Sequence, residues 1–234
     1  MKIGIFLINL DDRNDRLDSS TRQLNKIGLE FIRVSAVPSK DVEESIFLTD
    51  SVFACWKSHL KTYSMLVESD LEYALILEDD FLFKNPKKFS RFLANLETER
   101  HDLLQIGFIL PGIFNRLRWV FEEIEKVVFY SLGFVSKIIG LKSLSKRLRI
   151  AEASNVSLRF TPSSFLPGTH AYLINRKMAS TLVSLDSPQF SADEFFIALS
   201  KMRSFRMARF WRSLITQSNS APSINNRFVI EGAK

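Results

Sequence analysis

The 234-residue chain has one cysteine, few glycines and prolines, and no long uninterrupted apolar run. A single cysteine excludes an internal disulfide, so we expect a reducing compartment and a Cys55 that serves as a small buried hydrophobe. Residues 127–141 form the longest apolar window, yet a membrane-spanning helix needs about 20 apolar residues. The apolar run at 3–10 is short and lacks the cleavage site of a signal peptide. These absences predict a cytoplasmic protein.

Apolar residues and unevenly placed positive charge are what the chain does have. Hydrophobic residues make up 46% of the sequence, including 21 phenylalanines, which indicates a folded core rather than disorder. The 32 basic and 26 acidic residues give a formal charge of +6. Two acid-free stretches suit a phosphate-bearing ligand or an anionic membrane surface, with a solvated basic face as the alternative. Their basic residues are Lys126, Lys137, Lys142, Lys146, Arg147 and Arg149, then Lys201, Arg203, Arg206, Arg209, Arg212 and Arg227.

Apolar runs alternate with amphipathic segments, a pattern typical of an α/β protein with a mostly parallel sheet flanked by helices. We expect a single domain over 1–234 with a basic helical insertion at 111–150, where apolar residues recur every three or four positions. The insertion is either a buried helix pair or a helix that contacts a membrane. The predicted strands cover 3–10, 29–34, 73–77, 103–109, 168–175 and 209–217. The predicted helices cover 14–27, 50–67, 86–97, 177–185 and a segment that Ser191 caps.

The predicted strand at 73–77 runs into three consecutive acids, Glu78, Asp79 and Asp80. Ligands of open α/β sheets bind at the carboxyl ends of strands, and adjacent carboxylates repel one another unless their charge is compensated. Carboxylate oxygens suit Mg²⁺ or Mn²⁺, which complete their coordination with phosphates and water. Strand alternation places Glu78 and Asp80 on one side and Asp79 on the other. The sequence predicts a divalent-cation site here, with three exposed turn acids as the alternative.

Several other motifs are missing. The sequence has no GxxxxGK or GxGxxG phosphate loop and no GxSxG elbow, which argues against nucleotide hydrolases and dinucleotide oxidoreductases. A nucleotidyltransferase is disfavoured because no glycine-rich loop follows the first strand. Three histidines and one cysteine give little support to a zinc site. A nucleic-acid-binding protein would leave the acidic strand end unexplained, so no nucleic-acid partner is expected. A non-catalytic membrane-associated protein remains as an alternative function.

Five segments, in their order along the chain, resemble glycosyltransferase family 25, which includes bacterial lipooligosaccharide galactosyltransferases. They are FLINLDDRNDR at 6–16, ACWKSH at 54–59, LILEDDFLF at 75–83, GTHAYLIN at 168–175 and SADEFF at 191–196, followed by a strand that contains Gln217. The similarity spans most of the chain and leaves out 111–159. The order and spacing of the segments together make the resemblance specific.

The resemblance implies a GT-A-like (Rossmann-like) nucleotide-sugar fold and an inverting, metal-dependent hexosyltransferase that uses Mn²⁺ or Mg²⁺. The donor would be a UDP-sugar, with UDP-galactose as the first choice and UDP-glucose as the alternative. The acceptor would be a lipid-linked oligosaccharide of lipooligosaccharide or a related surface glycan. The basic insertion would then contact the anionic acceptor or the cytoplasmic face of the inner membrane.

The same resemblance assigns roles to residues near the donor. Asn9, Arg13 and Arg16 would lie near the nucleotide, and Gln217 matches a family glutamine. The three acids at 78–80 would stand in for the DxD-type motif that holds the metal and the diphosphate. Because Glu78 replaces the first aspartate of that motif, Asp80 is the favoured metal ligand and Glu78 the second candidate, while Asp79 would contact the donor.

Further candidates lie elsewhere in the matched segments. Asp193 matches the acid of the family's D-x-F-like segment and is expected to be the catalytic base, with a plain helix N-terminal charge as the alternative. His59, with Ser58, would bind donor or acceptor, or else be a core histidine beside an apolar stripe. Gly168 would let the sugar approach the backbone, with His170 next to it in the substrate site.

Overall fold

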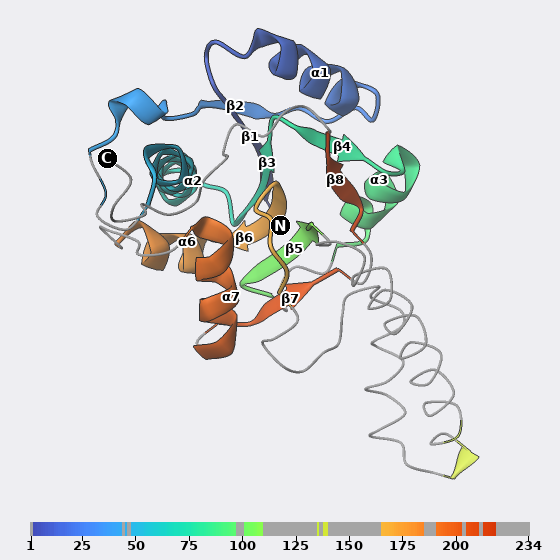
Figure 1. Ribbon diagram of the computed structural model, residues 1–234. Coiled ribbons are helices and arrows are strands. Elements are labelled where there is room, and N and C mark those ends of the chain that lie inside the picture. Colours follow the sequence, from blue (N-terminus) through green and yellow to red (C-terminus); the bar gives the residue numbers. More distant parts are fainter. Residues whose placement is uncertain are drawn as a thin grey trace.

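The structure is a computed structural model that describes residues 2–43, 45, 48–96, 101–109, 135, 138–139, 165–184, 191–202, 205–210 and 213–218. Over these residues the chain forms one curled, eight-stranded sheet with helices on both faces, the predicted α/β class (Figure 1). The strands are β1 (Ile3–Asn9), β2 (Ile32–Ser35), β3 (Tyr73–Glu78), β4 (Phe81–Phe83), β5 (Leu103–Gly107), β6 (Ala171–Asn175), β7 (Met207–Arg209) and β8 (Ile215–Gln217). The helices are α1 (Asn14–Asn25), the 3-10 turn η1 (Ser39–Asp41), α2 (Asp50–Glu68), α3 (Pro86–Ala94), α6 (Arg176–Val183) and α7 (Ala192–Met202).

The strand order is β2-β1-β3-β6-β5-β8-β4, with β7 also paired to β5. Strand β1 is parallel to β2 and β3, and β5 is parallel to β7 and β8. The antiparallel pairs are β3 with β6, β6 with β5, and β4 with β8. Parallel strands β1, β2, β3 and β8 therefore end at one edge of the sheet, where the antiparallel strands β6 and β4 begin. The acidic segment after β3 lies at this edge.

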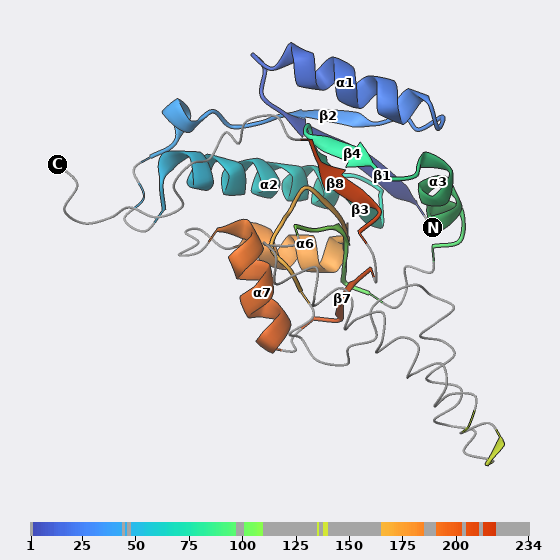
Figure 2. The same ribbon diagram turned by 45° about the vertical axis from the view of Figure 1, so that its right-hand side comes forward.

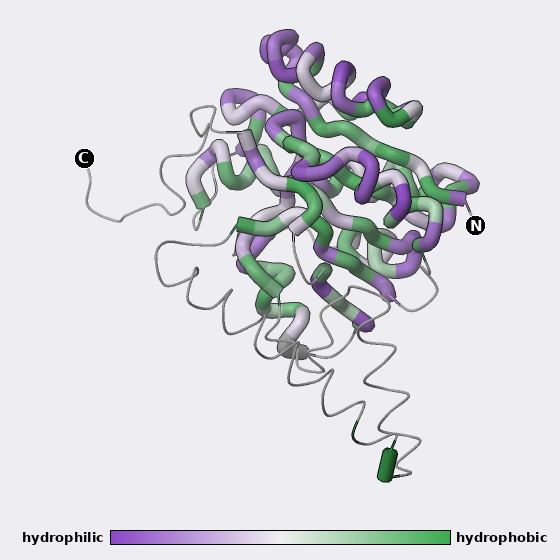
Figure 3. Tube along the Cα trace, turned by 90° about the vertical axis from the view of Figure 1, so that its right-hand side faces the viewer, coloured by the Kyte–Doolittle hydropathy of each residue, from purple (hydrophilic) through white to green (hydrophobic). Residues whose placement is uncertain are grey.

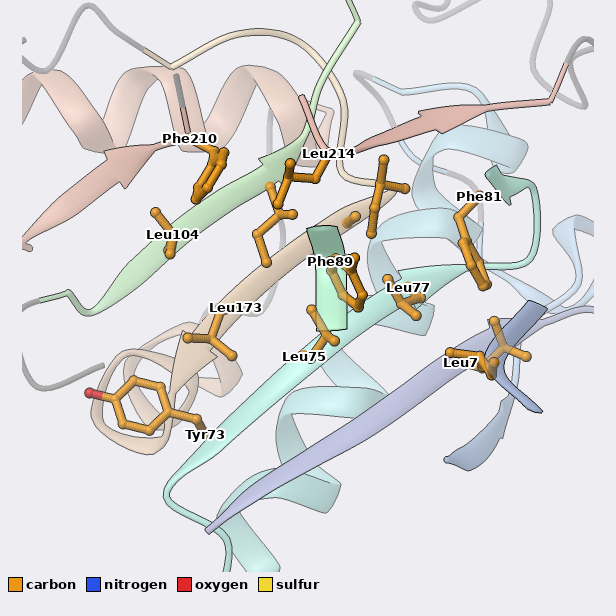
Figure 4. Packing of buried hydrophobic residues seen from close by; sticks show 14 of the residues in the cluster. Leu7, Tyr73, Leu75, Leu77, Phe81, Phe89, Leu104, Leu173, Phe210 and Leu214 are labelled. Atoms are coloured by element: carbon orange, nitrogen blue, oxygen red, sulfur yellow. The ribbon is translucent and has the colours of Figure 1, made fainter. Parts of the chain in front are cut away.

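Successive residues of β3 supply two separate cores. Leu75 and Leu77 pack on the face covered by α1 and α3, and Ala74 and Ile76 pack on the face covered by α2, α6 and α7. Figure 2 shows α1 on one side of the strands and α2 on the other. Figure 4 shows part of the first core, in which leucines of β1, β3, β5 and β6 meet phenylalanines that include Phe89 of α3. Because both faces are covered, β3 is a continuous apolar run rather than an alternating one.

Local sequence sets where the helices begin and end. Helix α3 begins with Pro86, and the Asn85 side chain accepts a hydrogen bond from the backbone N–H of Lys88. Gly28 follows α1 at a φ of +67°, a left-handed conformation that ends a helix.

Figure 3 shows that α1 is largely hydrophilic over a strand layer that is largely hydrophobic. Among the helices of the described ranges, none combines the length and apolar character needed to cross a membrane.

Four sequence expectations need correction or fall outside the described part. The predicted strand at 209–217 is wrong, because two separate strands, β7 and β8, pair with β5 in place of one continuous strand. Phe210 N–H donates to Gln105 O and Leu214 N–H donates to the adjacent Ile106 O, so four residues advance one step along β5. The predicted strands at 29–34 and 168–175 begin only at Ile32 and Ala171. The helical insertion expected at 111–150 lies outside the described residues except at 135 and 138–139.

Asp102 joins the beginning of β5 to two other segments. Its carboxylate accepts hydrogen bonds from Arg206 N (2.7 Å), Arg206 Nη2 (3.1 Å) and Asn175 Nδ2 (2.8 Å). Asn175 in turn caps α6 through the N–H of Met178. Burial raises the pKa of Asp102, but the hydrogen bonds from Arg206 and Asn175 outweigh it, and the net pKa lies below the usual aspartate value.

Asp102→Asn should lower the free energy of unfolding by about 1–2 kcal/mol at neutral pH, because charge-assisted hydrogen bonds are lost. A depressed folded pKa gives stability that is complete above the unfolded value near 4 and is lost as the pH falls through the folded value. The difference between wild type and variant in urea unfolding should therefore shrink on acidification. Asp70→Asn, at an exposed pair with Lys2, is the control and should leave stability nearly unchanged. A difference that stays constant from neutral to acid pH would contradict the assignment.

Candidate active site

The three acids after β3 diverge into three different environments. Glu78 contacts Thr169 and the imidazole of His59 from α2. Asp79 contacts the end of β1 and helix α1, on the opposite face of the sheet. Asp80 lies beside Gln217 at the end of β8. The alternation predicted for Glu78 and Asp79 follows from the pleat of β3, which sends successive side chains to opposite faces.

Asp79 is held by residues expected near the donor. Its Oδ2 accepts a hydrogen bond from Asn9 Nδ2 at 2.8 Å, and its Oδ1 pairs with Arg16 Nη1 at 3.1 Å. Ser20 Oγ donates to the backbone carbonyl of Asp79 at 2.9 Å. The side chains of Arg16 and Asp79 are each only 10% exposed, and Asn9 also accepts a hydrogen bond from Arg33 Nε at 3.1 Å. The structure therefore brings Asn9, Arg16 and Asp79 together as a frame that fixes the turn after β3.

Glu78 is the end of a buried polar chain. Thr169 Oγ1 donates to Glu78 Oε1 at 2.6 Å, and His59 Nε2 lies 3.4 Å from the same oxygen. His59 Nδ1 is 2.7 Å from Tyr172 Oη, which is 2.6 Å from Tyr63 Oη. Burial raises the pKa of Glu78, but the imidazole of His59 and the hydroxyl of Thr169 lower it further, so the net pKa is below the usual value. Glu78 is thus held as a carboxylate.

Asp80 is the acid whose charge is least compensated. Gln217 Nε2 donates to Asp80 Oδ2 over a long 3.4 Å, and Oδ1 is buried with no hydrogen-bond partner among the described residues. Burial, together with the negative charges of Glu78 and Asp79, raises the pKa of Asp80 to about 7. A hard divalent cation at Oδ1 would supply both the missing partner and the missing positive charge. The residues therefore fit the expected Mg²⁺ or Mn²⁺ at Asp80.

His170 and Gly168 form one packing unit near this edge. The imidazole of His170 is fully buried, and a Cβ at Gly107 would lie 2.5 Å from its Nε2. A Cβ at Gly168 would lie 3.1 Å from its Nδ1, and Gly168 has a φ of +117°. Both glycines make room for the ring, and burial lowers the pKa of His170. The structure thus assigns Gly168 a role in packing His170, in addition to the substrate approach expected of it.

The remaining candidates sit around this edge with partners of their own. Arg13 follows β1 and donates to Asp15 from Nε at 3.0 Å and Nη2 at 2.9 Å. Ser58 Oγ donates to Ala54 O and accepts from the N–H of Val37, which ties α2 to the segment after β2. Its hydroxyl therefore already has two backbone partners.

Asp193 lies in the first turn of α7, as expected. Its Oδ1 accepts hydrogen bonds from Ser191 Oγ at 2.6 Å and from the N–H of Glu194 at 3.0 Å. The ring of Phe195 packs edge-on against Trp56 of α2, with ring centroids 5.1 Å apart. Trp56 is one turn from His59, so the beginning of α7 lies on the same face of the sheet as Glu78.

Sequence reasoning missed four contributors to this site. Thr169 stands inside the GTH segment but gives no signal of its own, and Tyr63 lies inside a predicted helix where its hydroxyl gives no signal either. Gln105 holds the 166–168 loop by donating to the carbonyls of Leu166 (2.6 Å) and Gly168 (2.9 Å). Cys55 was expected to be a buried hydrophobe, yet it is only partly buried and lies beside His59 and Glu78. Its spacing of four residues from His59 was the available signal.

Comparison with known proteins gives consistent matches. The family model "Glycosyltransferase family 25 (LPS biosynthesis protein)" matches residues 2–196. Procollagen galactosyltransferase 2 of Homo sapiens is 26% identical over 189 residues, covering 63% of this chain and 29% of that protein. Procollagen galactosyltransferase 1-B of Xenopus laevis is 30% identical over 175 residues, covering 60% and 27%. The chain thus spans less than a third of the length of these relatives.

A solved structure also matches at low similarity. It is described as "Crystal Structure of A197 from STIV", with 12% identity and a TM-score of 0.40, and it covers 92% of this chain and 83% of that chain. Similarity at this level carries no argument about the site.

Two neighbouring acids should have opposite effects on stability. Asp79→Ala removes the carboxylate that Arg16 and Asn9 contact and should lower the free energy of unfolding by about 3 kcal/mol or more. Asp80→Asn should raise it by about 1 kcal/mol in the presence of chelator, because a repelled buried charge is lost. The folded pKa of Asp80 is raised, so its cost appears as the pH rises from about 4 through about 7. The gain in Asp80→Asn should therefore be larger at about pH 8 than at about pH 4.

Thermal unfolding with chelator at both pH values measures this pair of effects. Destabilisation by both substitutions, to a similar extent, would show that Asp80 is a structural acid like Asp79.

Proposed function

This chain belongs to glycosyltransferase family 25, and from that membership we propose that it transfers a hexosyl residue, galactose in the first instance, from a UDP-sugar to a glycan acceptor. The observation that carries the proposal is the buried Oδ1 of Asp80, which has no hydrogen-bond partner among the described residues and stands beside two further carboxylates. Two relatives with galactosyltransferase in their names support galactose as the donor sugar. UDP-glucose is the alternative donor.

The proposed donor site uses the edge where β1, β3 and β8 end. Asp80 would hold Mn²⁺ or Mg²⁺, which when bound neutralises charge on the leaving diphosphate. The Glu78 carboxylate is turned toward His59 and Thr169. We therefore propose that Asp80 ligates the cation directly and that Glu78 contributes only its negative charge nearby. Gln217, next to Asp80, would orient the diphosphate, and Arg13, with a side chain 33% exposed, adds positive charge at the end of β1.

The frame beneath this edge would keep the ligand oxygens in place. Asn9 and Arg16 hold Asp79 from below, and Asp79 fixes the backbone from which Asp80 projects. Asn9, Arg16 and Asp79 therefore act on the donor by positioning Asp80. His170 is packed between Gly107 and Gly168, and its backbone carbonyl accepts a hydrogen bond from the N–H of Glu78. The packed His170 would in the same way fix the backbone at Glu78. Such pre-organisation matters because charge develops on the diphosphate within the site.

Asp193 is the proposed catalytic base. In an inverting transfer, a carboxylate removes the proton of the acceptor hydroxyl as that oxygen attacks the anomeric carbon opposite the departing UDP. Asp193 lies in the first turn of α7, where its Oδ1 accepts hydrogen bonds from Ser191 Oγ and from the N–H of Glu194. Its helix packs on α2 through Phe195 and Trp56. His59 of α2 is fully buried, so it would act on the substrate site through Glu78 rather than by touching the donor or acceptor.

The proposed acceptor is a lipid-linked oligosaccharide of the lipooligosaccharide type. The matching family is described as an LPS biosynthesis protein family, which supports this class. The basic stretches noted in the sequence suit an anionic acceptor or the anionic inner-membrane surface. Turnover measured on lipid-linked acceptors and on short soluble acceptors gives the preference of the enzyme between the two. Equal turnover on both would remove the membrane part of the proposal.

Titration of UDP and UDP-galactose by calorimetry should give binding that requires Mn²⁺ and is abolished by chelator. Asp80→Asn should remove the metal-dependent part, because the variant lacks the anionic ligand oxygen. Asp70→Asn, the same substitution in the segment that precedes β3, is the matched control and should bind as wild type does. Metal-independent binding of equal strength in wild type and Asp80→Asn would overturn the assignment of Asp80.

Asp193→Asn should lower kcat by roughly a hundredfold or more while leaving donor affinity unchanged, because only proton removal is lost. Glu194→Gln, one residue on and bonded to the same Ser191 hydroxyl, is the control and should keep most of the turnover. Proton NMR of the product reports whether the anomeric configuration is inverted. Full kcat in Asp193→Asn would exclude it as the base.

A further inference from the structure

A second set of metal-ligand atoms lies on the α2 side of the sheet. Cys55 Sγ, a ring nitrogen of His59 and a carboxylate oxygen of Glu78 all lie within 4.8 Å of one another. Cys55 and His59 are four residues apart on α2, which places them next to each other on one helix face. Glu78 comes to them from the end of β3. Three ligands of three different types thus meet where α2 crosses the acidic edge.

The nitrogen of His59 that points into this group has an unusual environment. His59 is completely buried, and its Nε2 has no hydrogen-bond partner among the described residues. The nearest acidic oxygen, Glu78 Oε1, is 3.4 Å away, outside hydrogen-bond geometry. A buried polar nitrogen without such a partner carries a desolvation cost unless something else binds it.

The other nitrogen of His59 is firmly held. Nδ1 lies 2.7 Å from Tyr172 Oη, and Tyr172 Oη lies 2.6 Å from Tyr63 Oη, so an Nδ1–H can be donated into a chain of two hydroxyls. With the proton on Nδ1, Nε2 presents a lone pair on the side of the Glu78 carboxylate, so both groups can ligate one cation. With the proton on Nε2 instead, the ring faces Glu78 directly and no cation is held between them. An outer hydrogen bond on the second ring nitrogen is the usual arrangement of a metal-binding histidine.

We propose that Cys55, His59 and Glu78 bind a divalent cation of the zinc class. Thiolate and imidazole ligands favour Zn²⁺ over Mg²⁺ or Mn²⁺, whereas Asp80 offers only hard oxygen. Zinc bonds of about 2.0–2.3 Å in a tetrahedron place ligand atoms roughly 3.3–3.8 Å apart, and the 3.4 Å between His59 Nε2 and Glu78 Oε1 lies in that range. The thiol proton of Cys55 leaves to solvent on binding, and the fourth position is open to water.

This site does not rest on the proposed function. It would join α2 to the end of β3 and keep the Glu78 carboxylate directed toward Cys55 and His59. Glu78 would then not ligate the cation proposed at Asp80. The edge would then carry two chemically different cation positions, one with thiolate and imidazole and one with carboxylate oxygen. One cysteine and three histidines are too few to indicate a zinc site from the sequence. The fold brings Cys55 and His59 together with Glu78, which a count of residues does not reveal.

Cobalt titration of the full-length chain tests the site with an intrinsic reporter. Cys55 is the only cysteine, so any thiolate-to-cobalt charge-transfer absorption in the near ultraviolet must come from it. We expect this band to saturate at one equivalent of Co²⁺ and to disappear when Zn²⁺ is added. Cys55→Ser should abolish the band. Tyr172→Phe should weaken Co²⁺ binding by roughly 10–100-fold, as loss of an outer-shell partner does, and His59→Gln should weaken it more.

Asp80→Asn is the control that separates the two cation positions, and it should keep the band even if it no longer binds UDP-galactose. Circular dichroism verifies that each variant is folded. A folded wild-type chain with no thiolate band at saturating Co²⁺ would overturn the proposal and leave His59 and Glu78 as a direct side-chain pair. A band that persists unchanged in folded His59→Gln would overturn it as well. Binding of UDP-galactose is measured independently, so failure of either idea leaves the other standing.

Discussion

Three consecutive carboxylates at the end of a buried strand are the constraint on which the arrangement of this edge depends. Like charges on adjacent residues cannot share one environment, and the pleat of β3 and the turn after it separate them. Asp79 receives Arg16 and Asn9 on one face, and Glu78 receives His59 and Thr169 on the other. Asp80 receives only a long contact from Gln217. The compensation of charge is thus complete for one acid, partial for the second and nearly absent for the third.

The decrease in charge compensation from Asp79 to Asp80 gives neighbouring residues different roles. Asp79 contributes to stability, and Asp80 is the acid proposed to bind a ligand. The partners of Asp79 come from β1 and α1, so its position is fixed as soon as the first βα unit packs against β3. Asp80 lies where β8 closes the sheet from the far end of the chain. A cation at Asp80 would therefore bring together segments from opposite ends of the sequence. With the donor site proposed for this member of glycosyltransferase family 25, the acidic strand end would be organised for a ligand rather than for its own stability.

Sequence reasoning found the elements whose periodicity is local and missed what depends on long-range pairing. The apolar run of β3, the glycine after α1 and the Asn-Pro beginning of α3 carry their signals within a few residues. The split of the last strand into β7 and β8 depends on hydrogen bonds to Gln105 and Ile106, about a hundred residues earlier. The acids were found because their type and order are unusual. Cys55 and Thr169 were not, because their significance arises only when α2 and the beginning of β6 approach Glu78.

The packing of His170 has a consequence for how such a chain can change. The imidazole occupies space that exists only because residues 107 and 168 carry no side chain, and those two residues lie on different segments of the molecule. A methyl group at 107 would lie 2.5 Å from Nε2 of His170, so a side chain there requires the ring to move or to be replaced by a smaller one. The order of substitutions therefore matters: a smaller residue at 170 meets no clash, whereas a side chain gained first at 107 does.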